Sequence, residues 1–351
     1  MIEHDLNGLD EWSKRWLMSF NPKKTEIMMF SNVNIPNLVF SLNDKEIPLV
    51  SVHKHLGVTF CSDAKWNSQI ENIISSASKH INVLRKIKYR LNRKNLEKFY
   101  LVYIRSILEY ASEVWDNCGT INSNRLENLQ LEAARIVTGL PIFTKIDNLY
   151  EELGWEKLDV RRQRRKLQMF YNITNSNAPE YLCKLVPPTI QSTTTYPLRN
   201  GQDLIVPFCR LSLTAESYIP STIREWNSLG PDIRNADSIS KFKNELKNRI
   251  SVDPVPKHFA YGPRKLNIVL TQIRCQASFL NHDLFRVNIV ASPSCNKCGS
   301  DIENAYHYFF ECAYYAQIRV TLLQNLSWLP ENCRLDLNLL TSGNTALTGT
   351  K

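Results

Sequence analysis

The chain has 351 residues, of which 43% are hydrophobic and 22% are charged. This balance excludes a wholly disordered chain, and the length suffices for two or three domains of roughly 100 to 200 residues each. The 43 Lys and Arg residues exceed the 34 Asp and Glu residues and give a net charge of +9, which favours polyanionic partners.

Two further features indicate the environment of the protein. The chain has nine cysteines, and Glu3, Asp5 and Asp10 interrupt any apolar run that could serve as a secretory signal. A disulfide scaffold is therefore not expected, and the odd cysteine count indicates thiols or metal ligands. No run of about 18 apolar residues is present, so we expect no membrane span and a location in the nucleus or the cytoplasm.

The first 62 residues predict one helix followed by short strands. Apolar residues from Leu6 to Leu17 recur at helical spacing, and the Asn21-Pro22 pair ends the pattern because the residue before a proline is disfavoured in a helix. Four short apolar runs then predict antiparallel strands, with turn residues such as Asn43-Asp44 between them. The four runs are Glu26 to Phe30, Leu38 to Leu42, Ile47 to Val50 and His55 to Phe60.

From Trp66 the hydrophobic period becomes helical. The first helix has an apolar face between Ile70 and Leu91, and the second, from Leu96 to Trp115, is apolar almost all round and is expected at the centre of a bundle. The third ends at Gly139, which is a typical residue just after a helix. Residues 66 to 140 are thus predicted to form a compact three-helix unit.

The remaining chain alternates helices with loops. Helices are predicted over 156 to 175 and near Ser240 to Ile250, whereas the region near 186 to 205 lacks a hydrophobic period and predicts a loop. A further unit follows Pro254 and Pro256 and contains most of the remaining cysteines. The fold class predicted from these elements is α+β, mostly α.

Basic residues are concentrated in the three-helix unit. Between Lys79 and Arg105 the chain has nine basic residues and one acid, Glu97. A helix of this charge density can follow a phosphate backbone, although an ordinary solvated face is the alternative. The interleaved aromatics, Tyr103 among them, are more typical of a packed core than of base stacking. The basic residues expected opposite the apolar face are Lys79, Lys86, Arg90 and Arg93.

A second basic patch lies in the helix predicted after residue 156. It has the sequence Arg161-Arg-Gln-Arg-Arg-Lys166. For its residues Arg161, Arg162 and Arg165, contact with phosphates and an ordinary surface role remain equally open.

Four candidate metal ligands have the spacing Cys295-x2-Cys298-x8-His307-x4-Cys312. Two thiolates two residues apart can chelate one ion from a tight turn, and a His/Cys pair completes the closed tetrahedral set of structural zinc. On an ideal helix His307 and Cys312 would lie about 140° apart, so at least one is expected at a helix end or on a distorted turn. The alternative is a pair of buried thiols with an unrelated histidine.

An independent active site is not visible in the sequence. Template-directed phosphoryl transfer needs paired aspartates to hold two Mg²⁺ ions about 4 Å apart, and the chain has no Asp-Asp pair. A phosphate-binding glycine loop and a serine-nucleophile motif are missing as well.

Several segments follow one another in a specific order along the chain. They are Trp12 to Trp16, Met18 to Phe30, His55 to Phe60, Tyr100 to Trp115, Leu129 to Gly139, Tyr218 to Pro220 and Trp226 to Leu229. In this order they resemble the end of the palm, the thumb and the downstream region of reverse transcriptases from non-LTR retrotransposons of the jockey or LINE type. The Cys/Cys/His/Cys cluster resembles the terminal zinc knuckle of the same proteins.

The resemblance implies a division into four regions. Residues 1–62 would be the end of the palm with its primer grip, and residues 63–145 the helical thumb. Residues 146–260 would form a helical connector with a loop near 186–205, and residues 261–351 a carboxy-terminal region with the zinc knuckle.

Site residues also follow from the resemblance. Asn21 and Lys24 match the family's Asn-Pro-x-Lys-Thr motif near the nucleotide site, which makes Lys24 a candidate contact to the triphosphate. Leu56 and Gly57 would form the primer-grip turn, where a glycine lets the backbone approach the primer end closely. Without the resemblance, Lys24 would be read as an ordinary surface lysine.

The family's catalytic Tyr/Phe-Ala-Asp-Asp motif does not occur in the sequence. We therefore expect a fragment of an RNA-directed DNA polymerase that grips nucleic acid but is inactive alone. Its cofactor would be structural zinc, with magnesium only in the complete parent enzyme. Its partners would be RNA, RNA/DNA or DNA duplex, and the missing upstream part of the polymerase. The alternatives are a host-adopted zinc-containing nucleic-acid-binding protein and a zinc-stapled helical interaction scaffold.

Overall fold

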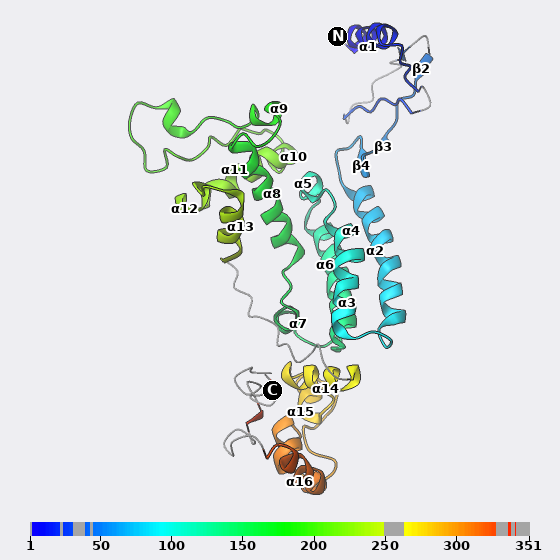
Figure 1. The fold of residues 1–351 in the computed structure, drawn as a ribbon, viewed down its shortest axis with the longest axis vertical. Coiled ribbons are helices and arrows are strands. Elements are labelled where there is room, and N and C mark those ends of the chain that lie inside the picture. The colour runs from blue at the N-terminus through cyan, green and yellow to red at the C-terminus, as the bar shows by residue number, and fades with distance from the viewer. Residues whose placement is uncertain are drawn as a thin grey trace.

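Helices and two small strand pairs make up the chain, whose computed structural model describes residues 2–21, 24–30, 39–42, 45–248, 263–327, 336, 337 and 341. The expected turn at 43–44 and the residues of the connector beyond 248 lie outside these ranges. The amino-terminal helix and strands occupy one end of the molecule, a helical bundle the middle, and α14 to α16 the other end (Figure 1).

The amino-terminal segment contains α1 (Ile2–Arg15) and a first strand pair. In this pair β1 (Phe40–Leu42) runs antiparallel to β2 (Lys45–Ile47). The predicted helix and strand pairing are thus present, but the runs at 26–30 and 47–50 do not form full strands. Between these two runs the structure has a single parallel bridge, from Ile27 to Leu49.

The second strand pair is a hairpin of β3 (Val52–His55) and β4 (Val58–Cys61). The prediction of one strand from His55 to Phe60 was wrong, because the two-residue turn of the hairpin interrupts this run. Leu56 has φ of 45° and Gly57 has φ of 85°, and such left-handed pairs match the twist of the flanking strands. The turn implied by the resemblance is therefore present.

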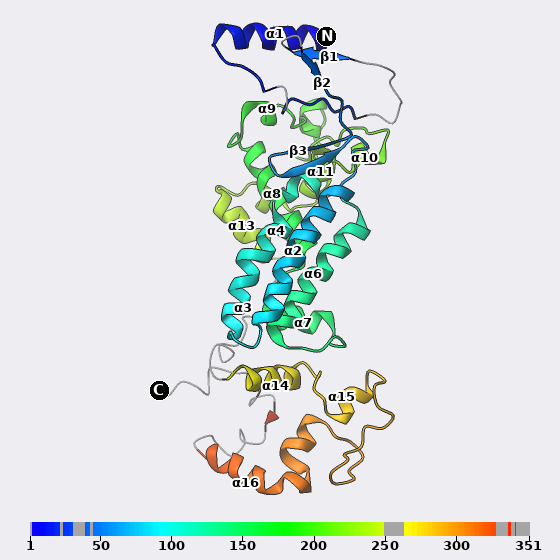
Figure 2. The ribbon, with the colours of Figure 1, turned by 90° about the vertical axis from the view of Figure 1, so that its right-hand side faces the viewer.

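A helical bundle follows the hairpin directly. It consists of α2 (Asn67–Ile87), α3 (Arg93–Phe99), a π-helical segment (Tyr100–Arg105), α4 (Ser106–Glu109), α5 (Ser112–Trp115), α6 (Thr120–Thr138) and α7 (Ile146–Leu153). Figure 2 shows α2 between α3 and α6. Fully buried apolar side chains from these helices, such as Ile70, Leu96 and Leu126, form one continuous core. The three helices predicted within residues 66 to 140 thus correspond to α2, to the segment from α3 to α5 and to α6.

The second predicted helix, from Leu96 to Trp115, is not continuous. Its middle turn is π-helical, and it breaks after Tyr110, because Ala111 adopts a left-handed conformation with φ of 49°. The indole nitrogen of the buried Trp115 donates to the Tyr110 carbonyl at 2.9 Å. This hydrogen bond gives the carbonyl oxygen a partner where the helix is interrupted. The apolar pattern correctly placed Tyr100, Ile104 and Leu108 in the core. It did not reveal the change in helical geometry, and Val102 and Tyr103 are exposed, so the helix is not buried all round.

A second core is formed around α8 (Leu158–Thr174), which packs against α11 (Tyr218–Asn227) and α13 (Ile239–Asn248). Its large buried rings are Phe170, Trp226 and Phe242. The short helices here are α9 (Glu180–Cys183), α10 (Ser212–Ala215) and α12 (Pro231–Arg234). The predicted loop near 186–205 contains a short 3-10 turn (Ile190–Thr193).

The carboxy-terminal unit docks on the base of the bundle through α14 (Arg264–Arg274). The Arg264 guanidinium donates to the carbonyl oxygens of Ile136 and Val137, at 2.6 and 2.9 Å, and so caps the end of α6. Ile268 packs so closely on Gly139 that a Cβ on this glycine would lie 2.6 Å from the isoleucine side chain. The contact therefore requires glycine.

The rest of this unit contains α15 (Asn281–Phe285), a π-helical segment (His307–Glu311), a 3-10 turn (Ala313–Tyr315) and α16 (Ala316–Asn325). None of the helices in the described ranges has the length and apolar character needed to cross a bilayer.

Candidate nucleic-acid interface and metal centre

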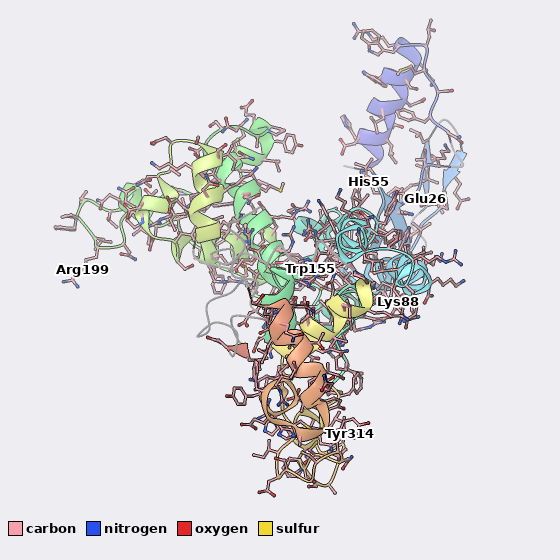
Figure 3. The ribbon with its side chains drawn as sticks, turned by 60° about the horizontal axis from the view of Figure 1, so that its bottom comes forward. Glu26, His55, Lys88, Trp155, Arg199 and Tyr314 are labelled. Carbon is pink, nitrogen blue, oxygen red and sulfur yellow. The ribbon has the colours of Figure 1, made fainter. Side chains whose placement is uncertain are left out.

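Five basic side chains on and between α2 and α3 are exposed and have no ion-pair partner among the described residues. They are Lys79, Lys86, Arg90, Lys94 and Lys98, and we call them the free basic residues. Figure 3 shows the neighbouring Lys88 on the outside of the bundle, where its amine lies 4.8 Å from the centre of the Tyr89 ring. Unpaired cations of this density can hold phosphates without breaking internal contacts.

Arg93 does not belong to this exposed set. The sequence placed Arg93 opposite the apolar face of one continuous helix. Helix α2 ends at Ile87, however, so its helical period does not include Arg93. Arg93 instead opens α3, is only 5% exposed, and places Nη1 2.5 Å from Oε1 of the buried Glu152. Its Nε contacts Glu97 at 3.0 Å. The expectation that Arg93 faces solvent was therefore wrong, because its charge is used inside the protein.

The basic patch of α8 is also used internally. Arg161 pairs with Glu109, Arg162 with Asp116 at 3.0 Å, and Arg165 with Glu113 at 2.9 Å. Arg162 is only 2% exposed and lies over the Trp115 ring. These contacts join α8 to the segment that contains α4 and α5. The ordinary surface role that the sequence left open does not describe Arg162, which is buried, and all three guanidinium groups have acidic partners.

The hairpin turn is attached to the bundle by one side chain. The Tyr110 hydroxyl donates to the Leu56 carbonyl at 2.8 Å, and the Tyr110 ring would lie 3.2 Å from a Cβ on Gly57. The Leu56 side chain is 79% exposed at the tip. Figure 3 shows His55, which precedes the turn, beside the end of the bundle. Sequence reasoning missed the role of Tyr110, since no local pattern marks a contact over 54 residues.

Asn21 and Lys24 lie in a short exposed turn after α1. The Asn21 carbonyl accepts hydrogen bonds from the backbone amides of Lys24 and Thr25, at 2.9 and 3.1 Å. The hydroxyl of Thr25 also donates to this carbonyl, at 3.0 Å. The segment that follows α1 lies at the amino-terminal end of the molecule, away from α3 (Figure 1).

The candidate metal ligands Cys295, Cys298, His307 and Cys312 are brought together. Their donor atoms all lie within 4.8 Å of one another. The sulfurs of Cys295 and Cys312 are 4.0 Å apart, close to the roughly 3.8 Å that tetrahedral zinc with Zn–S bonds of about 2.3 Å requires. Three of the four residues are buried. The cluster could therefore hold a metal ion.

The local backbone explains how these donors converge. Gly299, with φ of 77°, closes the turn after the first cysteine pair, and its amide donates to the Cys295 carbonyl at 2.9 Å. The Cys312 amide donates to the His307 carbonyl at 2.8 Å, across five residues. This π-helical bond widens the turn and brings His307 and Cys312 to one side. The expected distortion is thus confirmed.

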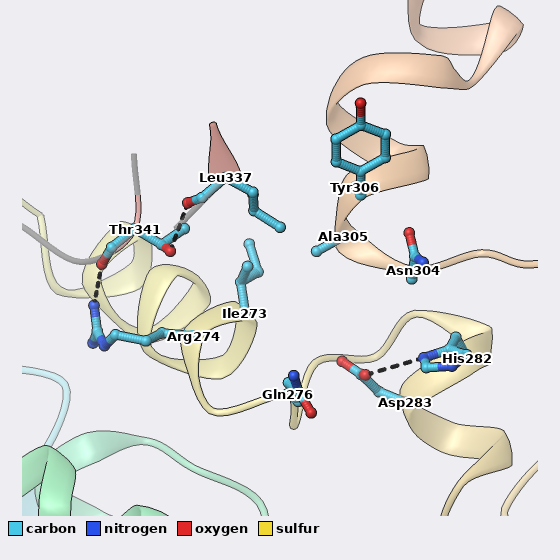
Figure 4. Close-up of a pocket in the computed structure, with 10 residues that line it drawn as sticks. All are labelled: Ile273, Arg274, Gln276, His282, Asp283, Asn304, Ala305, Tyr306, Leu337 and Thr341. Atoms are coloured by element: carbon cyan, nitrogen blue, oxygen red, sulfur yellow. Dashed lines mark hydrogen bonds and ion pairs between the residues drawn. The ribbon is translucent and has the colours of Figure 1, made fainter. Parts of the chain in front are cut away.

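The carboxy-terminal unit also contains a cavity of about 300 Å³ between α14, α15 and the start of the π-helical segment (Figure 4). The ring of His282 and the side chain of Tyr306 line it. Arg274 also lines it, but its guanidinium contacts Glu152 at 2.9 Å and the Thr341 carbonyl at 2.7 Å. The cationic side chain of this cavity is therefore already used to hold the fold together.

Comparisons with known proteins relate the chain to one class of enzyme. The "Probable RNA-directed DNA polymerase from transposon BS" of Drosophila melanogaster is 23% identical over 158 residues, which cover 44% of this chain and 17% of that protein. The "RNA-directed DNA polymerase from mobile element jockey" of Drosophila funebris is 22% identical over 160 residues, which cover 45% and 18%. These relatives are polymerases of non-LTR retrotransposons.

The resemblance noted in the sequence is thereby confirmed. The matched part nevertheless spans less than a fifth of either relative, 17% and 18% of their lengths. No family model and no solved structure matches the chain.

Proposed function

We propose that the chain is a carboxy-terminal part of a non-LTR retrotransposon reverse transcriptase that holds RNA or an RNA/DNA duplex. In this proposal residues 1–62 are the end of the palm, 63–145 the thumb, 146–260 the connector and 261–351 the zinc-bearing end. The observation that supports it most is the presence of the free basic residues on the bundle of a chain related to RNA-directed DNA polymerases.

The grip would act through the sugar-phosphate backbone. Each lysine or arginine that meets a phosphate releases condensed counterions, so binding is tolerant of sequence and weakens as salt rises. The free basic residues need not give up internal partners for this purpose. The α8 arginines would have to leave carboxylates that are buried or partly buried, which is costly, so they contribute to the fold instead.

The hairpin and the turn after α1 would have separate roles in the complete polymerase. The turn at Leu56 and Gly57 would lie against the primer end, held in place by Tyr110. Asn21 and Lys24 would lie near the incoming triphosphate. The paired carboxylates that hold magnesium would come from the parent enzyme, because the sequence has no Asp-Asp pair.

The four ligands Cys295, Cys298, His307 and Cys312 would hold structural zinc. Two of them come from the Gly299 turn and two from the π-helical segment, so the ion would join two short pieces with little apolar core between them. Four protein ligands leave no position for a catalytic water, which makes the role structural.

The binding proposal is tested with a variant that removes four of the free basic residues, Lys79→Ala, Lys86→Ala, Arg90→Ala and Lys98→Ala. Fluorescence anisotropy with a labelled RNA/DNA duplex would be recorded at several salt concentrations. We expect affinity to fall at least tenfold at low salt and the slope of log affinity against log salt to decrease by up to about four.

The matched control removes four exposed lysines on and beside α9 and α13, Lys184, Lys241, Lys243 and Lys247, and so changes the net charge equally. It should retain most of the affinity. Equal losses in both variants would mean that only the net charge matters, and no binding by the parent protein at low salt would contradict the proposed grip. The latter result would favour the interaction scaffold.

Inactivity alone is tested separately. The purified chain, a primed RNA template, Mg²⁺ and deoxynucleotides should give no primer extension. Extension by the chain alone would show that the catalytic carboxylates had been wrongly assigned to the missing part of the polymerase.

A further inference from the structure

A pair of aromatic side chains lies on the outside of the bundle beside the free basic residues. Tyr103 is 52% exposed, and its ring lies nearly parallel to that of His80, with 9° between the planes and 6.3 Å between the centres. The Phe99 ring packs against the Tyr103 ring, with 4.9 Å between the ring centres. The pair joins α2 to the π-helical segment.

The π-helical turn explains why Tyr103 is exposed. In an ordinary α-helix, residues three and four apart share a face, so Tyr100, Tyr103 and Ile104 would all point into the core. Tyr100 and Ile104 are indeed fully buried, but the wider turn rotates Tyr103 away from them. Such π-bulges occur frequently at functional sites. The sequence-based interpretation of these aromatics as core residues was right for Tyr100 and wrong for Tyr103.

His80 is held in a fixed orientation. Its Nδ1 donates to the Ser76 carbonyl at 3.0 Å, because a carbonyl oxygen can only accept, and the ring is therefore fixed next to Tyr103. A ligand that stacks here would not have to order the histidine first, which reduces the entropic cost of binding.

The separation of the two rings leaves aromatic surface uncovered. The stacked pair of Tyr100 and Trp155 in the core has its centres 4.0 Å apart, whereas those of His80 and Tyr103 are 6.3 Å apart with planes almost parallel. The outer pair is therefore not a close face-to-face stack, and the 52% exposure of Tyr103 shows that part of its side chain is uncovered. Val102, the neighbour of Tyr103, is 59% exposed and extends the apolar surface.

The charge around this surface favours an anionic strand over a protein or a neutral ligand. Lys79 precedes His80 and Lys98 precedes Phe99, and both lysines are exposed without an ion-pair partner among the described residues. The nearby acid, Glu97, already contacts Arg93 at 3.0 Å. An exposed aromatic ring on a helical surface that also carries unpaired cations is the combination that binds single-stranded nucleic acid.

We propose that Tyr103 and His80 form a stacking site for an unpaired base of the nucleic acid whose phosphates lie on the free basic residues. This inference rests on the proposed function and defines its substrate further. The favoured ligand is a strand with at least one unpaired base, such as single-stranded RNA or DNA next to a duplex, and a fully paired duplex cannot use the site.

The experiment compares Tyr103→Ala and His80→Ala with the parent protein, using oligonucleotides that carry the fluorescent base 2-aminopurine. RNA and DNA single strands and a fully paired duplex would be titrated at several salt concentrations. We expect the parent to quench the single-stranded probes, and Tyr103→Ala to bind them about tenfold more weakly, with less quenching and an unchanged salt slope. Tyr103→Phe should behave as the parent. Duplex affinity should not change.

The control is Tyr181→Ala in α9, which removes another exposed aromatic ring, 69% exposed, away from the basic residues. Parent-like affinity and quenching in Tyr103→Ala would overturn the stacking site while leaving the proposed grip intact. An equally large effect of Tyr103→Ala on the duplex would overturn the preference for unpaired bases. If the parent bound no probe at any salt concentration, the proposed function would fail together with the site.

Discussion

At the scale of single residues, the hairpin turn depends on two residues 53 positions apart, Gly57 and Tyr110. The glycine supplies a left-handed conformation with φ of 85°, and the tyrosine covers it and binds the neighbouring carbonyl. The exposed Leu56 is thereby held at the tip although a leucine disfavours its own φ of 45°. A strained apolar residue kept in this way at a tip is typical of a site that makes contact with something else.

We predict that Gly57→Ala destabilises the hairpin by about 1 to 2 kcal/mol, because a Cβ in the left-handed region is strained and would meet the Tyr110 ring. Faster amide hydrogen exchange at residues 52–61 is the measurement. The control is Gly8→Ala in α1, where no atom lies within 4 Å of the added carbon and helix propensity increases. Unchanged exchange in Gly57→Ala would show that the turn adapts without cost.

How far single residues could be predicted depended on whether their partners are local. The metal ligands were visible because two cysteines two residues apart and a His/Cys pair must lie near one another along the chain. Arg93 was misplaced because its partner, Glu152, is 59 residues away. Tyr103 was misplaced because a single π-helical turn, which leaves no mark in the hydrophobic pattern, shifts it away from the buried face of Tyr100 and Ile104.

At the scale of elements, ion pairs hold α8 against its neighbours. Lys166 is buried between Asp116, at 3.2 Å, and Glu225 of α11, at 2.6 Å. Burial raises the pKa of Glu225, and the hydrogen bond from Lys166 lowers it by less. The folded protein therefore retains this proton to a higher pH than the unfolded chain does.

A dependence of stability on pH follows from this shift. The contribution of Glu225 to stability is fully present below its unfolded pKa, near 4.5, and is lost as the pH rises through the higher folded pKa. The Glu225→Gln variant has no carboxyl group at this position, so it cannot lose this contribution as the pH rises. We predict that the free energy of unfolding of this variant, relative to the parent, increases as the pH rises above about 4.5. Denaturant titrations at intermediate pH values measure it, and a constant difference would contradict the shift.

A second set of charges joins α3, α7 and α14. Glu152 is 6% exposed and receives hydrogen bonds from Arg93, at 2.5 Å, and from Arg274, at 2.9 Å. Its carboxylate thus compensates two guanidinium groups inside the protein. Removal of one partner from such a buried group leaves uncompensated charge, which is costlier than the loss of a surface pair.

We predict that Glu152→Gln lowers the free energy of unfolding by about 3 kcal/mol. The control Glu180→Gln removes the exposed pair with Lys184 and should cost less than about 1 kcal/mol. Thermal and denaturant unfolding of both variants provide the comparison. A similar small loss in both would mean that solvent reaches Glu152 and screens its pairs.

The elements themselves were largely predictable where the apolar period is long. Helices α2, α6 and α8 have 21, 19 and 17 residues, and their buried faces repeat often enough to identify them. The sequence predicted one strand from His55 to Phe60 and missed the hairpin of residues 52–61, because the two residues of its turn interrupt the apolar run only briefly. Helix α7, with eight residues, was not predicted, since it has little more than two turns of periodicity.

At the scale of the whole molecule, the two ends of the chain have different sources of stability. The amino-terminal end has two separate two-stranded sheets, which are marginal without further packing. The carboxy-terminal end has short helices, and the four metal ligands lie between them. Only the bundle and the α8 region have extended apolar cores among the described residues.

We predict that removal of the metal loosens the carboxy-terminal unit but not the bundle, because the ion would replace an apolar core there. Chelation should accelerate amide exchange at residues 293–326, whereas α2 and α6 keep the protection of their own core. Cys298→Ser should reproduce this pattern without chelator, and Cys183→Ser, which changes a cysteine outside the cluster, should not. Exchange unaffected by chelation would argue that the cysteines are ordinary thiols.

The docking of α14 on the end of α6 is made by non-covalent contacts of its side chains, so we expect the two parts to stay together when the chain is cut between residues 248 and 263. Arg264, Ile268 and Arg274 contact the bundle through their side chains, and these contacts hold the carboxy-terminal unit in position. Two polypeptides that end and begin within this interval, produced together, should reassociate and co-purify. The joint could then serve as a site for splitting the protein or inserting a reporter.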